Sequence, residues 1–212
     1  MDISRPRTTK GQIMVSKTRQ KIVEAALERF HEFGYNGSSV NDVVQRAGVP
    51  KGSFYNYFKA KELLALEVLK IYAERSRFDI LADKSLRPLE RIRQHFGFMA
   101  ERYDRLGYAR GCLIGNLAAE STHEAPLVRT ALAESLGRWT DALEGVLREG
   151  QELGDVPSSV DARKTARFLI NSWEGAVIRM KITAAREPLD DFFDIAIALL
   201  DLQQRKDAGA HG

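Results

Sequence analysis

Apolar residues recur along most of this chain at the spacing of an α-helix. From residue 17 onward, Ile22, Ala26, Phe30 and Phe33 lie at about i, i+4, i+8 and i+11, on one stripe of an amphipathic helix. Similar stripes continue into the C-terminal region, and no convincing run alternates apolar and polar residues as a half-buried strand does. The pattern predicts an all-α fold.

Glycine and proline residues divide this pattern into about nine helical segments, since they end or precede most of the apolar stripes. A basic segment, residues 1–16, is predicted to be a flexible arm, and the residues after Asp207 a disordered tail. The predicted helices span residues 17–33, 39–47, 51–58, 60–83, 89–106, 111–121, 126–153, 161–183 and 189–204.

The first quarter of the chain differs in charge from the rest. Residues 1–61 carry a net charge of +6 and residues 62–212 a net charge of −3, which together give the +3 of the whole chain. This asymmetry favours a polyanion as the partner of the N-terminal part, although fluctuation over a short window would explain the charge alone equally well. We expect a small N-terminal domain, residues 17–62, and a larger helical domain, residues 63–206.

The composition argues against several other classes of protein. No charge-free stretch exceeds nine residues, far below the roughly 20 that a transmembrane helix needs, and the polar N-terminus does not resemble a secretory signal. The single cysteine, Cys112, excludes an internal disulfide framework, and the four histidines lack close metal-ligand spacing. We expect a cytoplasmic protein with no metal and no cofactor.

Two short helices joined by a glycine-containing turn follow the first predicted helix, and this order is typical of a helix-turn-helix. In the second short helix, Phe54 and Phe58 lie four residues apart and can pack on the preceding helices. Because Asn56 can bind adenine and Lys51 can reach guanine, we expect this helix to enter the major groove of DNA. The candidate DNA contacts on it are Lys51, Gly52, Ser53, Tyr55, Asn56 and Tyr57.

Three motifs lie between Thr18 and Glu62. They are Ile22-x-x-Ala25-Ala26-x-x-x-Phe30-x-x-x-Gly34-Tyr35, Ser39-Val40-x-Asp42-Val43-x-x-x-Ala47-Gly48-Val49 and Gly52-Ser53-Phe54-Tyr55-Asn56-Tyr57-Phe58-x-x-Lys61-Glu62. Together they closely resemble the TetR family of bacterial transcriptional regulators. The resemblance implies that Tyr57 and Lys61 contact DNA phosphates, that Ser39 caps the second helix, and that the third helix reads bases.

The same resemblance implies a homodimer joined by the predicted helices 161–183 and 189–204. The last helix supports this independently, because it carries more apolar surface than a small monomer readily hides, although burial within one chain is an alternative. A dimer predicts a pseudo-palindromic operator, since two-fold protein symmetry must be met by two-fold DNA symmetry. The apolar residues concerned are Phe192, Ile195, Ala196, Leu199 and Leu202.

Two further motifs occur in the C-terminal part: Arg110-Gly111-Cys112-Leu113-Ile114-Gly115-Asn116-Leu117-x-x-Glu120 and Trp173-Glu174-Gly175-Ala176-x-x-Arg179-x-Lys181. They resemble the AcuR- and NemR-type subgroup of the family, which implies an effector domain that senses a small organic acid or an electrophile. Helical spacing would place three of these residues on one face, toward a cavity. Ordinary packing is the alternative for the aromatic candidates, and a solvated or dimer-bridging role for the arginine. The candidate effector residues are Cys112, Asn116, Glu120, Tyr103, Trp139, Trp173 and Arg179.

Cys112 is a candidate chemical sensor. It follows Arg110 and begins a predicted helix, and both a neighbouring cation and a helix N-terminus lower the pKa of a thiol. A buried, inert thiol is the alternative. Two other functions are weighed: a DNA-binding regulator controlled by a protein partner, and an enzyme that pairs Cys112 with His123. On a continuous helix those two residues would lie roughly 16 Å apart, which argues against the enzyme.

Overall fold

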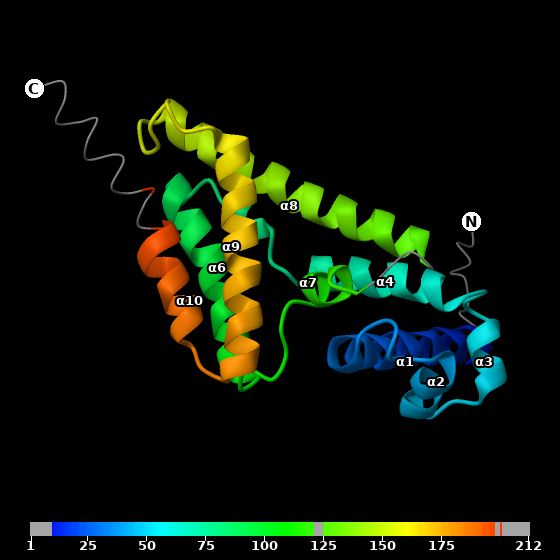
Figure 1. Cartoon of the computed structure of the whole chain (residues 1–212). Helices are drawn as coiled ribbons and strands as arrows, with labels where there is room; N and C mark the ends of the chain where they lie inside the picture. The colour runs from blue at the N-terminus through cyan, green and yellow to red at the C-terminus, as the bar shows by residue number, and fades with distance from the viewer. Residues whose placement is uncertain (1–9, 121–124, 198–199, 201–212) are drawn as a thin grey trace, which may run out of the picture.

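The computed structural model describes residues 10–120, 125–197 and 200, and every regular element in these ranges is a helix (Figure 1). The all-α prediction is confirmed. The helices are α1 (Lys10–Phe33), α2 (Val40–Ala47), α3 (Lys51–Tyr55), α4 (Lys61–Glu74), α5 (Asp79–Ala82), α6 (Pro88–Arg105), α7 (Leu113–Ala118), α8 (Pro126–Glu152), α9 (Ala162–Thr183), α10 (Glu187–Asp191) and the π-helical segment η1 (Phe192–Ile197).

Several predicted boundaries are wrong, two of them by the largest margin. Helix α1 begins at Lys10, so the second half of the segment predicted as an arm is helical, while residues 1–9 lie outside the described residues. The predicted helix 60–83 is divided into α4 and α5, because Arg77 adopts a left-handed φ of 53° and the Ser76 hydroxyl donates to the Tyr72 carbonyl. The apolar pattern continues across this break without a glycine or proline, so the sequence did not reveal it.

Helices α1, α2 and α3 pack together at one end of the molecule, and α6, α9 and α10 lie at the other end (Figure 1). Helix α8 packs along α9 and also contacts α4 and α6. Helices α4 and α7 lie between the two ends, and both contact α1. Any movement within the larger part can therefore reach the first three helices through α4 or α7. Within the described residues, no helix has the length and apolar character that a membrane crossing requires.

Aromatic residues form the centre of the larger part. The ring centroids of Phe96 and Phe192 lie 4.7 Å apart, and Trp173 lies 5.1 Å from each of them. Tyr103 stacks on Trp173 from α6. Each such side chain contributes about 1.5 to 3 kcal/mol through burial alone. Trp173 and Tyr103 are thus core residues that hold α6, α9 and η1 together.

One ion pair in the same part joins a buried arginine to a half-buried glutamate. The Arg91 side chain of α6 is fully buried, with Nη2 2.8 Å from Glu149 Oε1 of α8. Its Nη1 donates to the Leu81 carbonyl of α5 at 3.2 Å. A single guanidinium therefore joins α5, α6 and α8.

Candidate functional site

Helix α2 is closed by specific residues at both ends. Ser39 Oγ accepts from the Asp42 backbone N–H at 3.1 Å, and the Asp42 carboxylate accepts from the Ser39 N–H at 2.8 Å, a complete capping box. The hydrogen bonds from Ser39 lower the pKa of Asp42. Gly48 ends the helix with a φ of 64°. The prediction that Ser39 caps the second helix is confirmed, because Ser39 is the N-cap residue of α2.

Helix α3 has one buried side and one exposed side, as predicted. Phe54 and Phe58 are buried, and their ring centroids lie 5.7 Å apart. The helix ends at Tyr55, earlier than expected, so Asn56 is its C-cap residue. Among the candidate DNA contacts, Ser53 and Tyr57 are half-buried, whereas the exposed ones are Lys51, Gly52, Tyr55 and Asn56.

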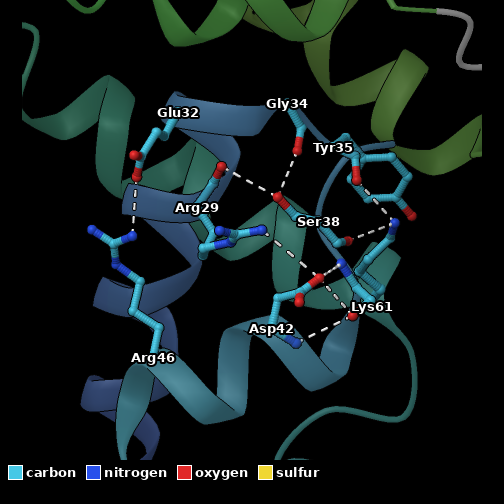
Figure 2. A network of polar contacts seen from close by, with 9 residues as sticks. Arg29, Glu32, Gly34, Tyr35, Ser38, Asp42, Arg46 and Lys61 are labelled. Atoms are coloured by element: carbon cyan, nitrogen blue, oxygen red, sulfur yellow. Dashed lines mark hydrogen bonds and ion pairs between the residues drawn. The ribbon is translucent and has the colours of Figure 1, made fainter.

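Lys61, for which the family resemblance implies a phosphate contact, binds backbone carbonyl groups in this structure. Its Nζ donates to the Tyr35 carbonyl at 2.9 Å and to the Ser38 carbonyl at 3.1 Å, and it lies 3.9 Å from the centre of the Tyr35 ring (Figure 2). Burial lowers the pKa of this amine. In this conformation Lys61 holds the turn between α1 and α2 in place, and the phosphate contact that the family resemblance implies stays a prediction.

Further polar contacts join α1 to α2 around this turn (Figure 2). The Ser38 hydroxyl lies 2.8 Å from the Gly34 carbonyl and 3.2 Å from the Arg29 carbonyl. Arg46 of α2 pairs with Glu32 at 3.0 Å and with Glu28 at 2.7 Å. These contacts fix the angle at which the helix-turn-helix leaves α1.

Glu120, which follows α7, contacts the same turn from the larger part of the molecule. Its carboxylate accepts from the backbone N–H groups of Tyr35 at 2.8 Å and Asn36 at 2.6 Å. The prediction that Glu120 shares a cavity with Cys112 is wrong, because α7 ends at Ala118 and the helical face does not extend to residue 120. We refer to this pair of hydrogen bonds as the Glu120 contact.

Glu62 forms a second link between the two parts. Its carboxylate accepts from the backbone N–H groups of Leu127 at 2.6 Å and Val128 at 3.3 Å, in the first turn of α8. A carboxylate in this position is favoured by the unpaired N–H groups and the dipole at a helix N-terminus. Sequence reasoning missed this link, because Glu62 carried no signal beyond its place in a family motif.

A small internal cavity lies between α4, α6, α7 and α8. Its volume is about 20 Å³, which is room for about one water molecule. The structure brings Cys112 and Trp139 to it, but Tyr103, Asn116, Trp173 and Arg179 do not line it. The residues that line it are Tyr72, Ser76, Phe78, His95, Met99, Cys112, Ile114 and Trp139.

Burial strongly shifts the pKa values of two side chains that line this cavity, Cys112 and His95. Burial, followed by the Glu174 carboxyl, raises the pKa of the Cys112 thiol well above its usual range. The expected lowering by Arg110 and the helix N-terminus is therefore wrong, because the sulfur faces a carboxyl group in a buried site. Burial lowers the pKa of His95 to about 4, so this ring is neutral at pH 7. The Nε1 of Trp139 is buried without a hydrogen-bond partner among the described residues.

The other effector candidates occupy ordinary positions. Asn116 is half-buried, and its Nδ2 has no hydrogen-bond partner in the described part of the chain. Arg179 is exposed on α9. His123, considered above as a partner of Cys112, lies outside the described residues.

Comparison with known proteins identifies the family. Residues 22–68 match the model of bacterial regulatory proteins of the tetR family, and residues 88–196 match the tetracyclin repressor-like C-terminal domain. The chain belongs to the TetR family of bacterial regulators. It is therefore a DNA-binding transcriptional regulator, and the family resemblance inferred from the sequence is confirmed.

Individual relatives of this TetR-family protein align with most of its length. The transcriptional repressor DhaR of Mycobacterium sp. (strain GP1) is 38% identical over 86% of this chain and 91% of its own. The transcriptional regulator AcuR of Cereibacter sphaeroides is 35% identical over 89% of this chain and 86% of its own. A crystal structure of the regulatory protein TetR from Rhodobacter sphaeroides superposes with a TM-score of 0.80 and 33% identity, covering 85% of this chain and 97% of that one. These relatives are regulators, not enzymes.

Proposed function

We propose that this regulator is a cytoplasmic repressor that binds a pseudo-palindromic operator as a homodimer and is released by a small organic acid or an electrophile. The exposed side of α3 carries the proposal, since Lys51, Tyr55 and Asn56 face outward above the buried Phe54 and Phe58. The repressor DhaR, which is similar over most of the chain, supports the direction of control. DNA binding is assigned to residues 17–62, and effector binding and dimerisation to residues 63–206.

Exposed apolar residues on the last helices support the homodimer, although Phe192 and Ala196, which the sequence assigned to this surface, are buried within the chain, and Leu199 and Leu202 lie outside the described residues. Phe168, Ile178 and Ile182 of α9 are 53%, 55% and 81% exposed, and Ile195 of η1 is 63% exposed. Apolar side chains gathered in this way are typical of a surface that another protein covers. A second copy of the chain, related by a two-fold axis, would bury them in a four-helix arrangement.

The small cavity favours a mechanism of population shift. At about 20 Å³ it is too small for an organic acid, so a ligand there must displace side chains of α4, α6 or α7. Helix α4 continues directly into the helix-turn-helix, and α7 reaches it through Glu120. A state with an enlarged cavity would thus hold the two recognition helices of a dimer at a different separation, and operator half-sites about 34 to 36 Å apart would no longer match both.

Selection from random duplex DNA at physiological salt tests DNA binding and symmetry together. We expect one pseudo-palindromic sequence to be enriched. The Asn56→Ala variant should lose base preference at one position of each half-site, by about 1 to 3 kcal/mol, because the amide reads a base edge. Gln94→Ala, which removes an exposed amide on α6, is the matched control and should leave the preference unchanged. An unaltered preference in Asn56→Ala would contradict the role of Asn56, and no enriched sequence would contradict DNA binding.

Operator release by acrylate, its saturated analogue propionate and N-ethylmaleimide tests the effector class. Because Cys112 is the single cysteine, Cys112→Ser removes all thiol chemistry and should abolish release by N-ethylmaleimide. The raised pKa of Cys112 means that alkylation, followed by mass spectrometry, should be slower than that of a free cysteine peptide. Its rate should rise about tenfold per pH unit below the thiol pKa, as the thiolate fraction does. Undiminished release of Cys112→Ser by N-ethylmaleimide would rule out sensing through this thiol.

A further inference from the structure

A cleft of about 240 Å³ separates α1 from the C-terminal ends of α4 and α6. It is distinct from the cavity at Cys112, since no residue lines both. Four arginines from three parts of the chain converge on it: Arg75 after α4, Arg102 and Arg105 on α6, and Arg110 before α7. The sequence shows no such cluster, because these residues are up to 35 positions apart.

The two carboxylates of the cleft are already paired. Glu24 accepts from Arg75 at 2.6 Å, and Glu28 accepts from Arg46 of α2 at 2.7 Å. Among the described residues, the ion pair of Arg105 is a long one, with Glu101 at 3.7 Å on the same helix. The cleft therefore has an excess of positive charge that its own acidic residues do not neutralise.

Arg102 and Arg110 have no anionic partner among the described residues. Both are half-buried, and the Arg102 guanidinium lies 5.1 Å from the centre of the Tyr72 ring, which fixes its position. The pKa of His31 responds to this positive charge. Burial lowers this pKa, and the nearby charges of Arg102, Arg110 and Lys181 lower it further. Its Nε2 donates to the Gly111 carbonyl at 2.5 Å, beside the cleft.

We propose that this cleft is a binding site for a small oxyanion, with Arg102 and Arg110 as its principal ligands. A guanidinium presents parallel N–H donors that match the two oxygens of a carboxylate or phosphate group. Two half-buried guanidinium groups from different elements line this cleft, and neither is paired with a carboxylate of the described residues, so they provide this recognition from two sides. The volume of about 240 Å³ admits a phosphate or a small carboxylate.

Inorganic phosphate, added to the full-length protein in a zwitterionic buffer, tests the site directly. The ring signals of the four histidines can be followed by NMR, and we expect a saturable shift of the His31 signal. Chloride at the same ionic strength should not produce it, and sodium acetate in the same titration compares a carboxylate with a phosphate. The measurement contains no DNA, so its outcome is independent of the proposed function.

Arg110→Gln is the decisive variant, because the Arg110 side chain makes no ion pair or hydrogen bond within the described residues and its loss should leave the fold intact. We expect the Kd for phosphate to rise roughly tenfold or more, the effect of losing one charged hydrogen-bonding partner. Arg110→Lys keeps the charge and loses the paired N–H donors, so its Kd for phosphate should lie between those of wild type and Arg110→Gln. Arg138→Gln, an exposed arginine of α8, is the charge-matched control and should bind phosphate as wild type does.

Two results would overturn the proposal. One is an equal shift of the His31 signal in chloride, which would show general ionic screening. The other is an equal Kd for phosphate in wild type, Arg110→Gln and Arg138→Gln. A His31 shift that does not saturate up to the highest phosphate concentration would likewise show general ionic screening.

Discussion

Gly34→Ala is expected to destabilise the protein by about 2 to 4 kcal/mol, through two additive causes. Gly34 has a φ of 75°, a left-handed conformation that costs other residues about 1 to 2 kcal/mol. In addition, a Cβ at this position would collide with the Glu120 carboxylate. The carboxylate could swing away only by giving up the Glu120 contact. Urea unfolding monitored by circular dichroism measures the sum.

Gly48→Ala separates the two causes. Gly48 has a similar φ of 64°, but a Cβ there would meet open space, so this variant carries only the backbone cost. In a Glu120→Ala background, the collision is absent and Gly34→Ala should cost no more than Gly48→Ala. If Gly34→Ala and Gly48→Ala are equally destabilising in the wild-type background, the Glu120 contact does not stabilise the turn.

Glu149→Ala is expected to lower the free energy of unfolding by about 1 to 3 kcal/mol, because it leaves the buried Arg91 guanidinium without its half-buried carboxylate partner. The double variant Arg91→Met, Glu149→Leu removes both charges and should be far less destabilising, since well-packed apolar residues often replace a buried ion pair at little cost. If Glu149→Ala lowers the free energy of unfolding no more than the double variant does, this account is contradicted.

The same pair has a defined pH dependence. Hydrogen bonds from Arg91 and Lys84 lower the pKa of Glu149 in the folded state. Its contribution is therefore complete above the unfolded pKa of about 4.3 and is lost as the pH falls through the lowered folded value. The difference in stability between wild type and Glu149→Ala should shrink in that acidic range, as unfolding curves at successive pH values would show.

Features governed by neighbouring residues were predictable from the sequence. The capping box depends on Ser39 and Asp42, three positions apart, and the packing of Phe54 on Phe58 depends on a spacing of four. Both follow from helix geometry alone, and so does the exposed side of α3. The sequence therefore predicts the main features of the helix-turn-helix without any knowledge of tertiary contacts.

Features governed by distant contacts were not predictable. Lys61 lies at a position where the family suggests a phosphate contact, but the carbonyl groups of the turn at residues 35–38 bind its amine. The pKa of Cys112 depends on its burial and then on Glu174, which lies on another helix, and neither can be inferred from the neighbouring residues in the sequence. The cleft with four arginines arises only when α1, α4 and α6 come together.

The Glu120 contact and the link between Glu62 and α8 have a joint mechanical consequence. The first three helices are attached to the rest of the molecule at several separate points, which include the Glu120 contact, the hydrogen bond from His31 to Gly111 and the ion pair between Glu24 and Arg75, and α4 is in turn attached to α8 through Glu62. A rigid body held at three or more points that do not lie on one line has no free rotation. While these attachments last, the recognition helix can change its position only if α4 and α7 move together with the first three helices.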